Sequence, residues 1–558
     1  MPTRKDFYNL LNDENISESE YNNVKKIWKS FNIENMKEFT MLYNTIDILL
    51  LADIMENFRE TALKIYKLDP AWNYTTPGFA WNCMLKTTKQ KFELLTDVDM
   101  LLICERAKRG GISQCSNRYA KANNKYMGKK FDKNKDSVFI QYLDANNLYG
   151  WAMCKYLPYG GFEWGNLENF DENKILNMKD DQKIGYYFEV DLKYPEELHD
   201  KHSDLPYCPE NIINDEKLPK LFTTLYDKKK YVLHYLNLKQ ALEAGLKLEK
   251  IHRVLKFDQS DWMRVYIEKN TKLRQEAKNN FEKDFFKLMV NSVFGRTMMN
   301  VRKHIDIKLI SDGKKYTKYV SKPNFEKSTF FCQNLAAVHM RKTQILFNQP
   351  IYIGVAILDI SKTLMYDFYY NELKERYGDK IKLLYTDTDS LITSIKTKDF
   401  YKDMKDMIDK FDTSDYKKDN IYGIPQVNKK VLGKFKDEVN GKIIDEFIGL
   451  ASKLYTYKMF ECSCFKKAKG IKKNIVEKNI NFDDYKTCLE LEKDKLINQR
   501  MIKSKKHDLS TIEQTKKGLS AFDDKRCIIK ESTDTLPWGH FKIGIERNNF
   551  IKHLRRLR

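Results

Sequence analysis

The sequence lacks an apolar stretch long enough to cross a bilayer, for which a helix needs about 20 residues. Its best apolar runs are short, "ILLLADIM" at 48–55 and "IYIGVAI" at 351–357, and the N-terminal stretch has no apolar core of a signal peptide. The ten cysteines form no Cys-x-x-Cys pair, and the closest two, Cys462 and Cys464, have no histidine cluster near them. These absences argue against a membrane protein, a disulfide scaffold and a zinc site. We expect a soluble intracellular protein with reduced thiols, in a nuclear, organellar or viral setting.

Positive charge, by contrast, is in excess. The 558 residues include 99 Lys and Arg against 78 Asp and Glu, a net charge of +21 with a pI of about 9.2. Basic side chains release the counterions condensed on nucleic acid, so a phosphate-rich partner is the favoured interpretation. A Lys-rich surface that serves only solubility is the alternative that charge alone leaves open. The length indicates three or four domains, or one large multi-lobed enzyme.

Local patterns of apolar residues predict a mixture of helices and strands along the chain. They predict helix at 16–66, a buried strand at 137–144, a long Lys- and Arg-rich helix or helix pair at 261–300, hairpins at 301–333, and helix at 336–378. The tail from 460 onward is Lys-rich and predicted to be partly helical.

Two carboxylates lie one residue apart between two strand-like runs, in "KIKLLYTDTDSLITSI" at 380–395. An antiparallel pairing of these runs leaves Asp387, Thr388 and Asp389 at the tip, with both carboxylates on one side. Two converging carboxylates raise each other's pKa unless a cation lies between them, which predicts a divalent metal site. A solvated hairpin turn is an equally good interpretation of this stretch taken alone.

A third carboxylate, Asp144, ends the predicted strand "SVFIQYLD". A strand-end Asp, then a basic helix, then an Asp-x-Asp hairpin is the order of a nucleotidyl-transferase palm. Such a site holds two metal ions about 4 Å apart, one at the attacking 3′-hydroxyl and one at the triphosphate. Two Mg²⁺ ions, for which Mn²⁺ could substitute, are therefore the expected cofactors.

The predicted helix between these carboxylates presents Lys283, Lys287, Asn291 and Gly295 at intervals of four residues, so they share one face. Lys287 could meet the triphosphate as a positive charge, and Gly295 would let a base pair approach closely. For a lone lysine, a solvated helix face would be the favoured alternative.

Three segments together carry a family resemblance. "DANNLYG" at 144–150, "KLMVNSVFG" at 287–295 and "YTDTDS" at 385–390 resemble motifs A, B and C of B-family DNA polymerases, in that order. They are most similar to the protein-primed group of viruses, organellar plasmids and Polinton-type elements, which "KANNKYM", "AFDDKRCIIK" and "LPWGH" also resemble. The resemblance covers about 40–558. It implies an α/β (α+β) right-hand fold with palm, fingers and thumb, and an enzyme that adds deoxynucleotides to a primer on a DNA template.

The resemblance also implies roles for particular residues. Asp144 and Asp389 would be the main metal ligands, assisted by Asp387, and Tyr149 would exclude a 2′-hydroxyl. The other implied contacts are the nucleotide-binding residues Arg274, Lys287, Asn291 and Gly295, the primer-binding Lys453 and Tyr455 of "SKLYTYK", and the DNA-binding Arg109, Gly110 and Gly111.

Some positions depart from the family pattern. Motif A has Asn147 and Gly150 where Ser and Pro are common, and motif B has Phe294 where Tyr is common. The template-binding Tyr-x-Gly-Gly element survives only as Lys108 to Gly111, which puts aromatic stacking there in doubt. None of these changes removes a predicted metal ligand.

The N-terminus resembles only the end of a proofreading exonuclease. "LYNTIDILLLAD" matches its last motif with Tyr43 and Asp47, but only 42 residues precede Tyr43 and none forms the Asp-x-Glu that hydrolysis requires. We therefore expect an N-terminally truncated chain without exonuclease activity, in which Tyr43 and Asp47 only pack.

The predicted domains follow from the motif positions. They are an RNase H-like exonuclease remnant at 1–105, palm at 106–157, an insertion resembling terminal-protein region 1 at 158–260, fingers at 261–300, an insertion resembling terminal-protein region 2 at 301–345, palm at 346–455, and thumb with C-terminal tail at 456–558. The two insertions suggest a terminal protein as a further partner, although surface insertions are energetically cheap.

Two alternatives remain. A catalytically inactive, nucleic-acid-binding remnant is compatible with the missing exonuclease motifs. A reverse transcriptase also uses paired aspartates, but places them adjacent in sequence, whereas Thr388 separates them here.

Overall fold

The computed structural model describes residues 1–213, 219–505, 507–529 and 532–546. Parts of the predicted 158–260 and 456–558 segments, including Lys530 of "AFDDKRCIIK" and residues 547–558, lie outside the described residues.

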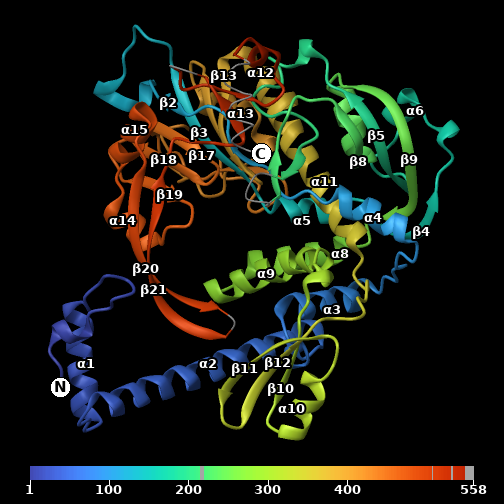
Figure 1. Cartoon of the computed structure of the whole chain (residues 1–558). Coiled ribbons are helices and arrows are strands. Elements are labelled where there is room, and N and C mark those ends of the chain that lie inside the picture. The colour runs from blue at the N-terminus through green and yellow to red at the C-terminus, as the bar shows by residue number, and fades with distance from the viewer. Residues whose placement is uncertain (214–218, 506, 530–531, 547–558) are drawn as a thin grey trace.

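A six-stranded sheet forms the centre of the molecule (Figure 1). Its order is β1 (Ser113–Cys115), β13 (Ile381–Asp387), β14 (Ser390–Lys396), β3 (Val138–Ala145), β16 (Phe435–Asp437) and β15 (Phe411–Asp412). All neighbours are antiparallel except β15 and β16. The predicted strand ending near Asp144 and the predicted hairpin of β13 and β14 are confirmed, and the sheet makes them direct neighbours.

Helix α11 (Ile351–Asp367) is buried on almost all sides, as its run of apolar residues requires. It continues through a π-helical segment, Phe368–Lys374, and α12 (Glu375–Tyr377) to Gly378, where the helix was predicted to end. The predicted start at 336 is wrong, because residues Leu335–Met340 form β12 and Pro350 immediately precedes α11. Strand β12 gains ladder partners on both sides, which override the local helical pattern.

A second sheet, in the order β4 (Leu157–Trp164), β9 (Lys247–Ser260), β5 (Ile184–Lys193) and β8 (Lys228–His234), lies on the other side of α11 (Figure 1). Helix α7 (Tyr235–Glu243) connects β8 to β9 and contacts α11. This unit occupies most of the predicted 158–260 insertion.

The predicted long helix at 261–300 is a pair, α8 (Arg264–Glu276) and α9 (Asn280–Thr297), which pack on each other and on α3 (Thr76–Thr88). Asn279 caps α9 by accepting a hydrogen bond from the Glu282 backbone N–H. The next segment folds as a three-stranded sheet of β10 (Asp306–Ile310), β12 and β11 (Phe325–Cys332) with α10 (Gly313–Val320) against it, which extends the predicted hairpins.

The predicted N-terminal helix is confirmed as two helices, α1 (Glu18–Ser30), with Ser17 as its cap, and α2 (Met36–Tyr66). Helix α2 extends from the body of the molecule as a long arm (Figure 1), and only Ala62 and Tyr66 are buried. The predicted packing role of Tyr43 and Asp47 is wrong, because both side chains are exposed, that of Tyr43 by 61%. Within the described ranges, no helix has the length and apolarity to span a bilayer.

The C-terminal part begins with a sheet of β19 (Cys464–Ala468), β18 (Leu454–Met459), β17 (Ile444–Ala451) and β2 (Tyr119–Lys121). Helices α14 (Lys473–Asn479) and α15 (Phe482–Leu491) follow. The long hairpin of β20 (Lys495–Lys505) and β21 (Asp508–Leu519) projects toward α9 and α2 (Figure 1).

Candidate active site

The tip between β13 and β14 is a tight turn held by backbone hydrogen bonds. Thr388 has a left-handed backbone with φ of 67°, and its N–H donates to the carbonyl of Ile112 at 2.7 Å. The Asp389 N–H donates to the carbonyl of Asp387 at 2.8 Å. The turn is therefore held in part by Ile112, the residue just before strand β1, which pairs with β13.

Sheet register brings Asp144 beside this turn. Ser390 pairs with Asp144, and the Ala145 N–H donates to the carbonyl of Asp389 at 2.7 Å. The two carboxylates predicted to be the main metal ligands thus leave neighbouring strands at the same end of the sheet.

The electrostatic environment at this end of the sheet disfavours ionisation of both Asp144 and Asp389. Burial, and secondly the charge of Asp389, raise the pKa of Asp144 to about 8. Burial likewise raises the pKa of Asp389, and Asp387 and Glu438 add to the effect. Lys287 lowers both pKa values, so its positive charge faces the pair across the site.

We predict that this unfavourable charge makes stability pH-dependent in the absence of divalent cations. The folded-state pKa of Asp144 lies above its unfolded value, so the stability that its protonation contributes is fully present below about pH 4 and is lost progressively as the pH rises to 8. Urea unfolding with a chelator should give a free energy that falls between pH 5 and 8.5, by roughly 3 kcal/mol from Asp144, since its partial exposure reduces the full effect.

The Asp144→Asn variant should lack this part of the decline and should be the more stable protein at pH 8.5. The same variant of an exposed carboxylate, Asp379→Asn, serves as the control. Equal pH slopes for the parent chain and Asp144→Asn would contradict the buried, repelled state of this carboxylate.

Asp387 has a different environment. Its Oδ2 lies 3.3 Å from Lys453 Nζ and 3.4 Å from the hydroxyl of Tyr385, which donates to it. The Lys453 N–H donates to that same hydroxyl at 3.0 Å, and the Tyr455 ring packs on Tyr385 with centroids 4.4 Å apart. Lys453 is half-exposed, whereas Tyr455 is buried. Of the predicted primer-binding pair, only the lysine is therefore accessible to a ligand.

Helix α9 places the four predicted residues on one face. Lys283, Lys287 and Gly295 are exposed, and Asn291 is half-buried. A side chain at Gly295 would meet no atom within 4 Å, so this face is open. Arg274 on α8 is half-buried, and its Nε is buried without a hydrogen-bond partner among the described residues. Burial lowers the pKa of Arg274, which marks a desolvated cation beside the open face.

Tyr149 connects the end of β3 to helix α9. It lies in α5 (Leu148–Met153), directly after β3, and its ring stacks on Phe294 of α9 with centroids 4.6 Å apart at 19°. Burial and the charges of Asp389 and Asp387 raise the pKa of Tyr149 to about 12, so its neutral hydroxyl lies within the field of the carboxylates.

The two residues of motif A that depart from the family pattern, Asn147 and Gly150, contact each other. Asn147 caps α5 with a left-handed backbone, φ of 46°, and its side chain accepts from the Gly150 N–H at 3.2 Å. A Cβ at Gly150 would lie 2.3 Å from the Asn147 amide nitrogen. Asparagine tolerates the left-handed region, and glycine makes room for its amide, so each residue accounts for the other.

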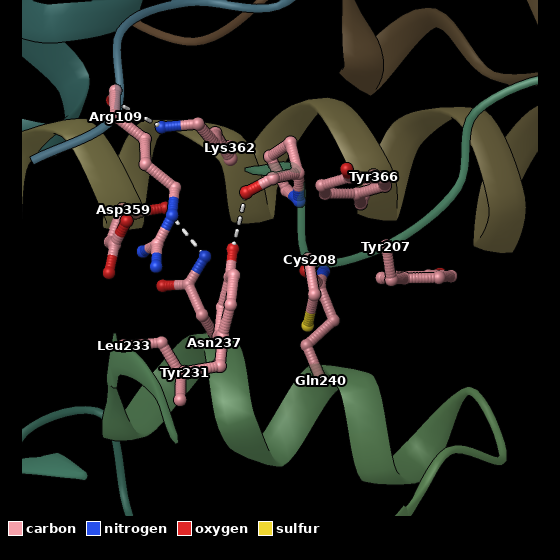
Figure 2. A pocket seen from close by; sticks show the side chains of 11 residues that line it. Arg109, Tyr207, Cys208, Tyr231, Leu233, Asn237, Gln240, Asp359, Lys362 and Tyr366 are labelled. Carbon is pink, nitrogen blue, oxygen red and sulfur yellow. Dashed lines mark hydrogen bonds between the residues drawn. The ribbon is translucent and has the colours of Figure 1, made fainter. Parts of the chain in front are cut away.

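Arg109 is not on the surface. Figure 2 shows its side chain pointing into a small pocket between α11 and α7, where it is 7% exposed. Its guanidinium donates to the carbonyl of Val232 at 2.6 Å and lies 3.7 Å over the Tyr231 ring, and Lys362 donates to the Arg109 carbonyl at 3.0 Å. The Arg109 side chain is therefore enclosed by protein, which contradicts the predicted direct contact of its guanidinium with DNA.

Gly110 and Gly111, by contrast, lead to the carboxylate turn. A Cβ at Gly111 would lie 2.3 Å from Thr388 Oγ1, whereas one at Gly110 would meet nothing within 4 Å. We therefore predict that Gly111→Ala displaces the turn and slows the primer extension that the family resemblance implies by roughly tenfold or more, because a misplacement of reacting groups by about 1 Å is costly.

Gly313→Ala, where a Cβ would also meet nothing within 4 Å, is the matched control and should leave extension unchanged. Adding Thr388→Gly to Gly111→Ala removes the clash and suits the left-handed backbone at this position, so activity should return. Equal rates for the two single alanine variants would contradict the contact between Gly111 and the turn.

The sequence patterns missed three charged residues of the site. Lys436 lies in β16 and Glu438 directly follows this strand. Glu438 raises the pKa of Asp144, and Lys436 lowers it. Lys430 lies in the loop before β16, where the charges of Arg274 and Lys283 act on its pKa. All three lie in a stretch where lysines and acids are frequent, so no spacing distinguishes them.

The carboxylates fit a metal as a pair. Among the described residues, no group of three or more His, Cys, Asp or Glu side chains is gathered closely enough to hold an ion alone. Mg²⁺ characteristically keeps several waters and binds one or two carboxylates together with substrate phosphates. Asp144 and Asp389, half-buried and close enough to repel each other, have the chemistry for such a shared site.

An antiparallel sheet with strand-end carboxylates, faced by a basic helix, defines the class of nucleotide-polymerising palms. Residues 3–374 match the family described as DNA polymerase type B, organellar and viral. The chain therefore belongs to this family of DNA polymerases.

Solved structures of Phi29 DNA polymerase are also similar to the chain. The ternary complex with primer–template DNA and incoming nucleotide matches over 80% of this chain and 68% of that one, with 16% identity and a TM-score of 0.47. The post-translocation binary complex matches over 79% and 67%, with 15% identity and a TM-score of 0.47. A comparison with curated proteins gives no match.

Proposed function

We propose that this DNA polymerase extends the 3′-hydroxyl of a primer with deoxynucleotides on a DNA template. The observation that carries the proposal is the register of β14 on β3, because it sets Asp144 beside Asp389 at the end of one sheet. Family membership supports the same activity.

In this proposal Asp144 and Asp389 hold two divalent ions, with Asp387 assisting. Bound Mg²⁺, or Mn²⁺, would lower the pKa of the 3′-hydroxyl and neutralise charge on the triphosphate. Lys287 and Arg274 bind the triphosphate, and their charges stabilise the pyrophosphate that leaves.

The remaining residues position the substrates. The stacked Tyr149 lies under the sugar, and Asn291 and Gly295 border the new base pair. Lys453 contacts the primer end, supported by the buried Tyr455. We assign the template contact near β1 to the backbone of Gly110 and Gly111, with Arg109 acting only as a support from inside.

The proposed lobes are those predicted from the motifs, with palm at 106–157 and 346–455, fingers at 261–300 and thumb in the C-terminal part. The separate sheets within 158–260 and 301–345 support, as a proposal, docking of a terminal protein and protein-primed replication of a mobile or viral-type element. Exonuclease activity is not expected from Tyr43 and Asp47, which lie on the exposed arm α2.

Primer extension tests the proposal. The purified chain, a labelled primer on a DNA template, deoxynucleotides and Mg²⁺ should yield stepwise extension that a chelator stops. DNA binding without incorporation would favour an inactive nucleic-acid-binding remnant instead. Equal extension on an RNA template would favour a reverse transcriptase.

A further inference from the structure

The loop of residues 428–434 is fastened to the chain just after Asp144. The Gly433 N–H donates to the Asn146 carbonyl, and the Asn146 N–H donates to the Lys434 carbonyl, both at 2.9 Å. A Cβ at Gly433 would lie 2.4 Å from the Trp151 ring, so the loop also packs tightly on α5. The loop then enters β16, where Lys436 pairs with Asp144.

A buried carboxylate completes this attachment. Asp412, at the end of β15, is 3% exposed, and its Oδ2 accepts from Asn146 Nδ2 and from the Lys430 N–H, both at 2.7 Å. The second bond holds Lys430 in a left-handed backbone with φ of 54°, which costs a lysine about 1 kcal/mol. The loop is therefore built to keep Lys430 in one orientation.

The orientation of Lys430 is toward the basic helices. Its Nζ donates to the carbonyl of Arg274 at 3.5 Å, and Gln275 donates to the Lys429 carbonyl at 3.3 Å. Burial, and then the charges of Arg274, Lys429 and Lys283, lower the pKa of Lys430. Cations from three elements thus converge on one place and repel one another.

Nearby carboxylates compensate this charge only in part, because Asp284 raises the pKa of Arg274 and Asp415 that of Lys430, but neither is paired with those cations. Asp415 pairs with Lys436 at 2.6 Å, and Glu268 and Glu276 lie within 4.0 Å of Arg264 and Lys272. Within the described parts of the chain, Arg274 Nε has no hydrogen-bond partner. A cavity of about 670 Å³ opens beside the cluster; its charged lining is four cations, Lys155, Arg264, Lys272 and Lys430, and the two carboxylates Glu268 and Glu276. Desolvated, mutually repelling cations next to open space are suited to a polyanion.

We propose that Lys430 is a further nucleotide-binding residue, which grips the polyphosphate end of the incoming nucleotide and the pyrophosphate product. This rests on the proposed polymerase function and adds to its triphosphate site a contact from outside the α8 and α9 helices. Asp412 is hydrogen-bonded both to the Lys430 backbone and to Asn146, two residues after Asp144. The same buried carboxylate therefore positions the phosphate-binding lysine and the chain segment that carries Asp144.

The test compares Lys430→Ala with Lys418→Ala, an exposed lysine of the same connecting segment, and with Lys430→Arg. Because Asp412 holds the Lys430 backbone, truncation of the side chain should leave the fold and the thermal midpoint unchanged. Lys430→Ala should raise the KM for deoxynucleotides, and that for pyrophosphate in the reverse reaction, by about tenfold, the value of one charge-assisted contact. The affinity for primer–template DNA should not change, and Lys430→Arg should restore most of the loss.

A second readout does not need catalysis. Calorimetric binding of inorganic tripolyphosphate should weaken by a similar factor in Lys430→Ala and not in Lys418→Ala. An unchanged KM and unchanged tripolyphosphate binding, in a chain that extends primers, would overturn the role of Lys430 and leave the polymerase function intact. A chain that extends no primer, yet binds tripolyphosphate through Lys430, would overturn the polymerase function and support the anion site.

Discussion

Replacing Asp389 with asparagine is expected to abolish primer extension, with a loss of at least roughly 10³-fold, because the several kcal/mol that a bound cation supplies to the developing charge is lost. The fold should survive the change. The contacts of Asp389 with the turn and with β3 are made by its backbone N–H and carbonyl, and asparagine keeps both.

The structure predicts two accompanying results. DNA affinity, measured by fluorescence anisotropy in a chelator, should remain at the parent value. Metal-free stability at pH 8 should rise, because removing one carboxylate relieves the repulsion that raises the pKa of Asp144. Asp379→Asn, an exposed carboxylate before β13, should change none of these quantities. Retained polymerisation in Asp389→Asn would remove this residue from the catalytic set.

Alternation along single strands located the carboxylates at strand ends, and the order of the three motifs distinguished them from solvated turns. Asp144 follows a run of buried residues, and Asp387 and Asp389 bracket a turn, so each pattern is contained in a few residues. What the pattern did not reveal is that Thr388 is left-handed and held by Ile112. That contact depends on β1, which is too short to be predicted from sequence.

Long-range packing accounts for the other differences. Arg109 was predicted to contact DNA because Lys108 to Gly111 resembles the family's template-binding element, but Val232 and Tyr231 from the second sheet enclose its side chain. The stretch "AAVHM" has helical composition, yet strands on both sides make it β12. Lys430 and Glu438 belong to the site only because β16 pairs with β3, a contact that no local spacing encodes.

The second large effect concerns sugar selection by Tyr149. Its ring is held from one side by Phe294, at 4.6 Å and nearly parallel, and lies in a half-buried position after Asp144. A ring so supported cannot turn aside at low cost, so we expect it to exclude a 2′-hydroxyl by its volume. Tyr149→Ala should therefore admit ribonucleotides, and the ratio of kcat/KM for deoxynucleotides over ribonucleotides should fall by roughly a hundredfold, the range expected for rejecting one added hydroxyl.

Two further variants separate the ring from its hydroxyl and from its support. Tyr149→Phe keeps the ring on Phe294 and should retain discrimination, whereas Phe294→Ala removes the support and should reduce discrimination in part while Tyr149 is still present. Single-nucleotide incorporation with each sugar measures the ratios. If Tyr149→Ala keeps the parent ratio, selection lies elsewhere. If Tyr149→Phe loses it as fully as Tyr149→Ala, the hydroxyl in the field of Asp387 and Asp389 is responsible, and not the volume of the ring.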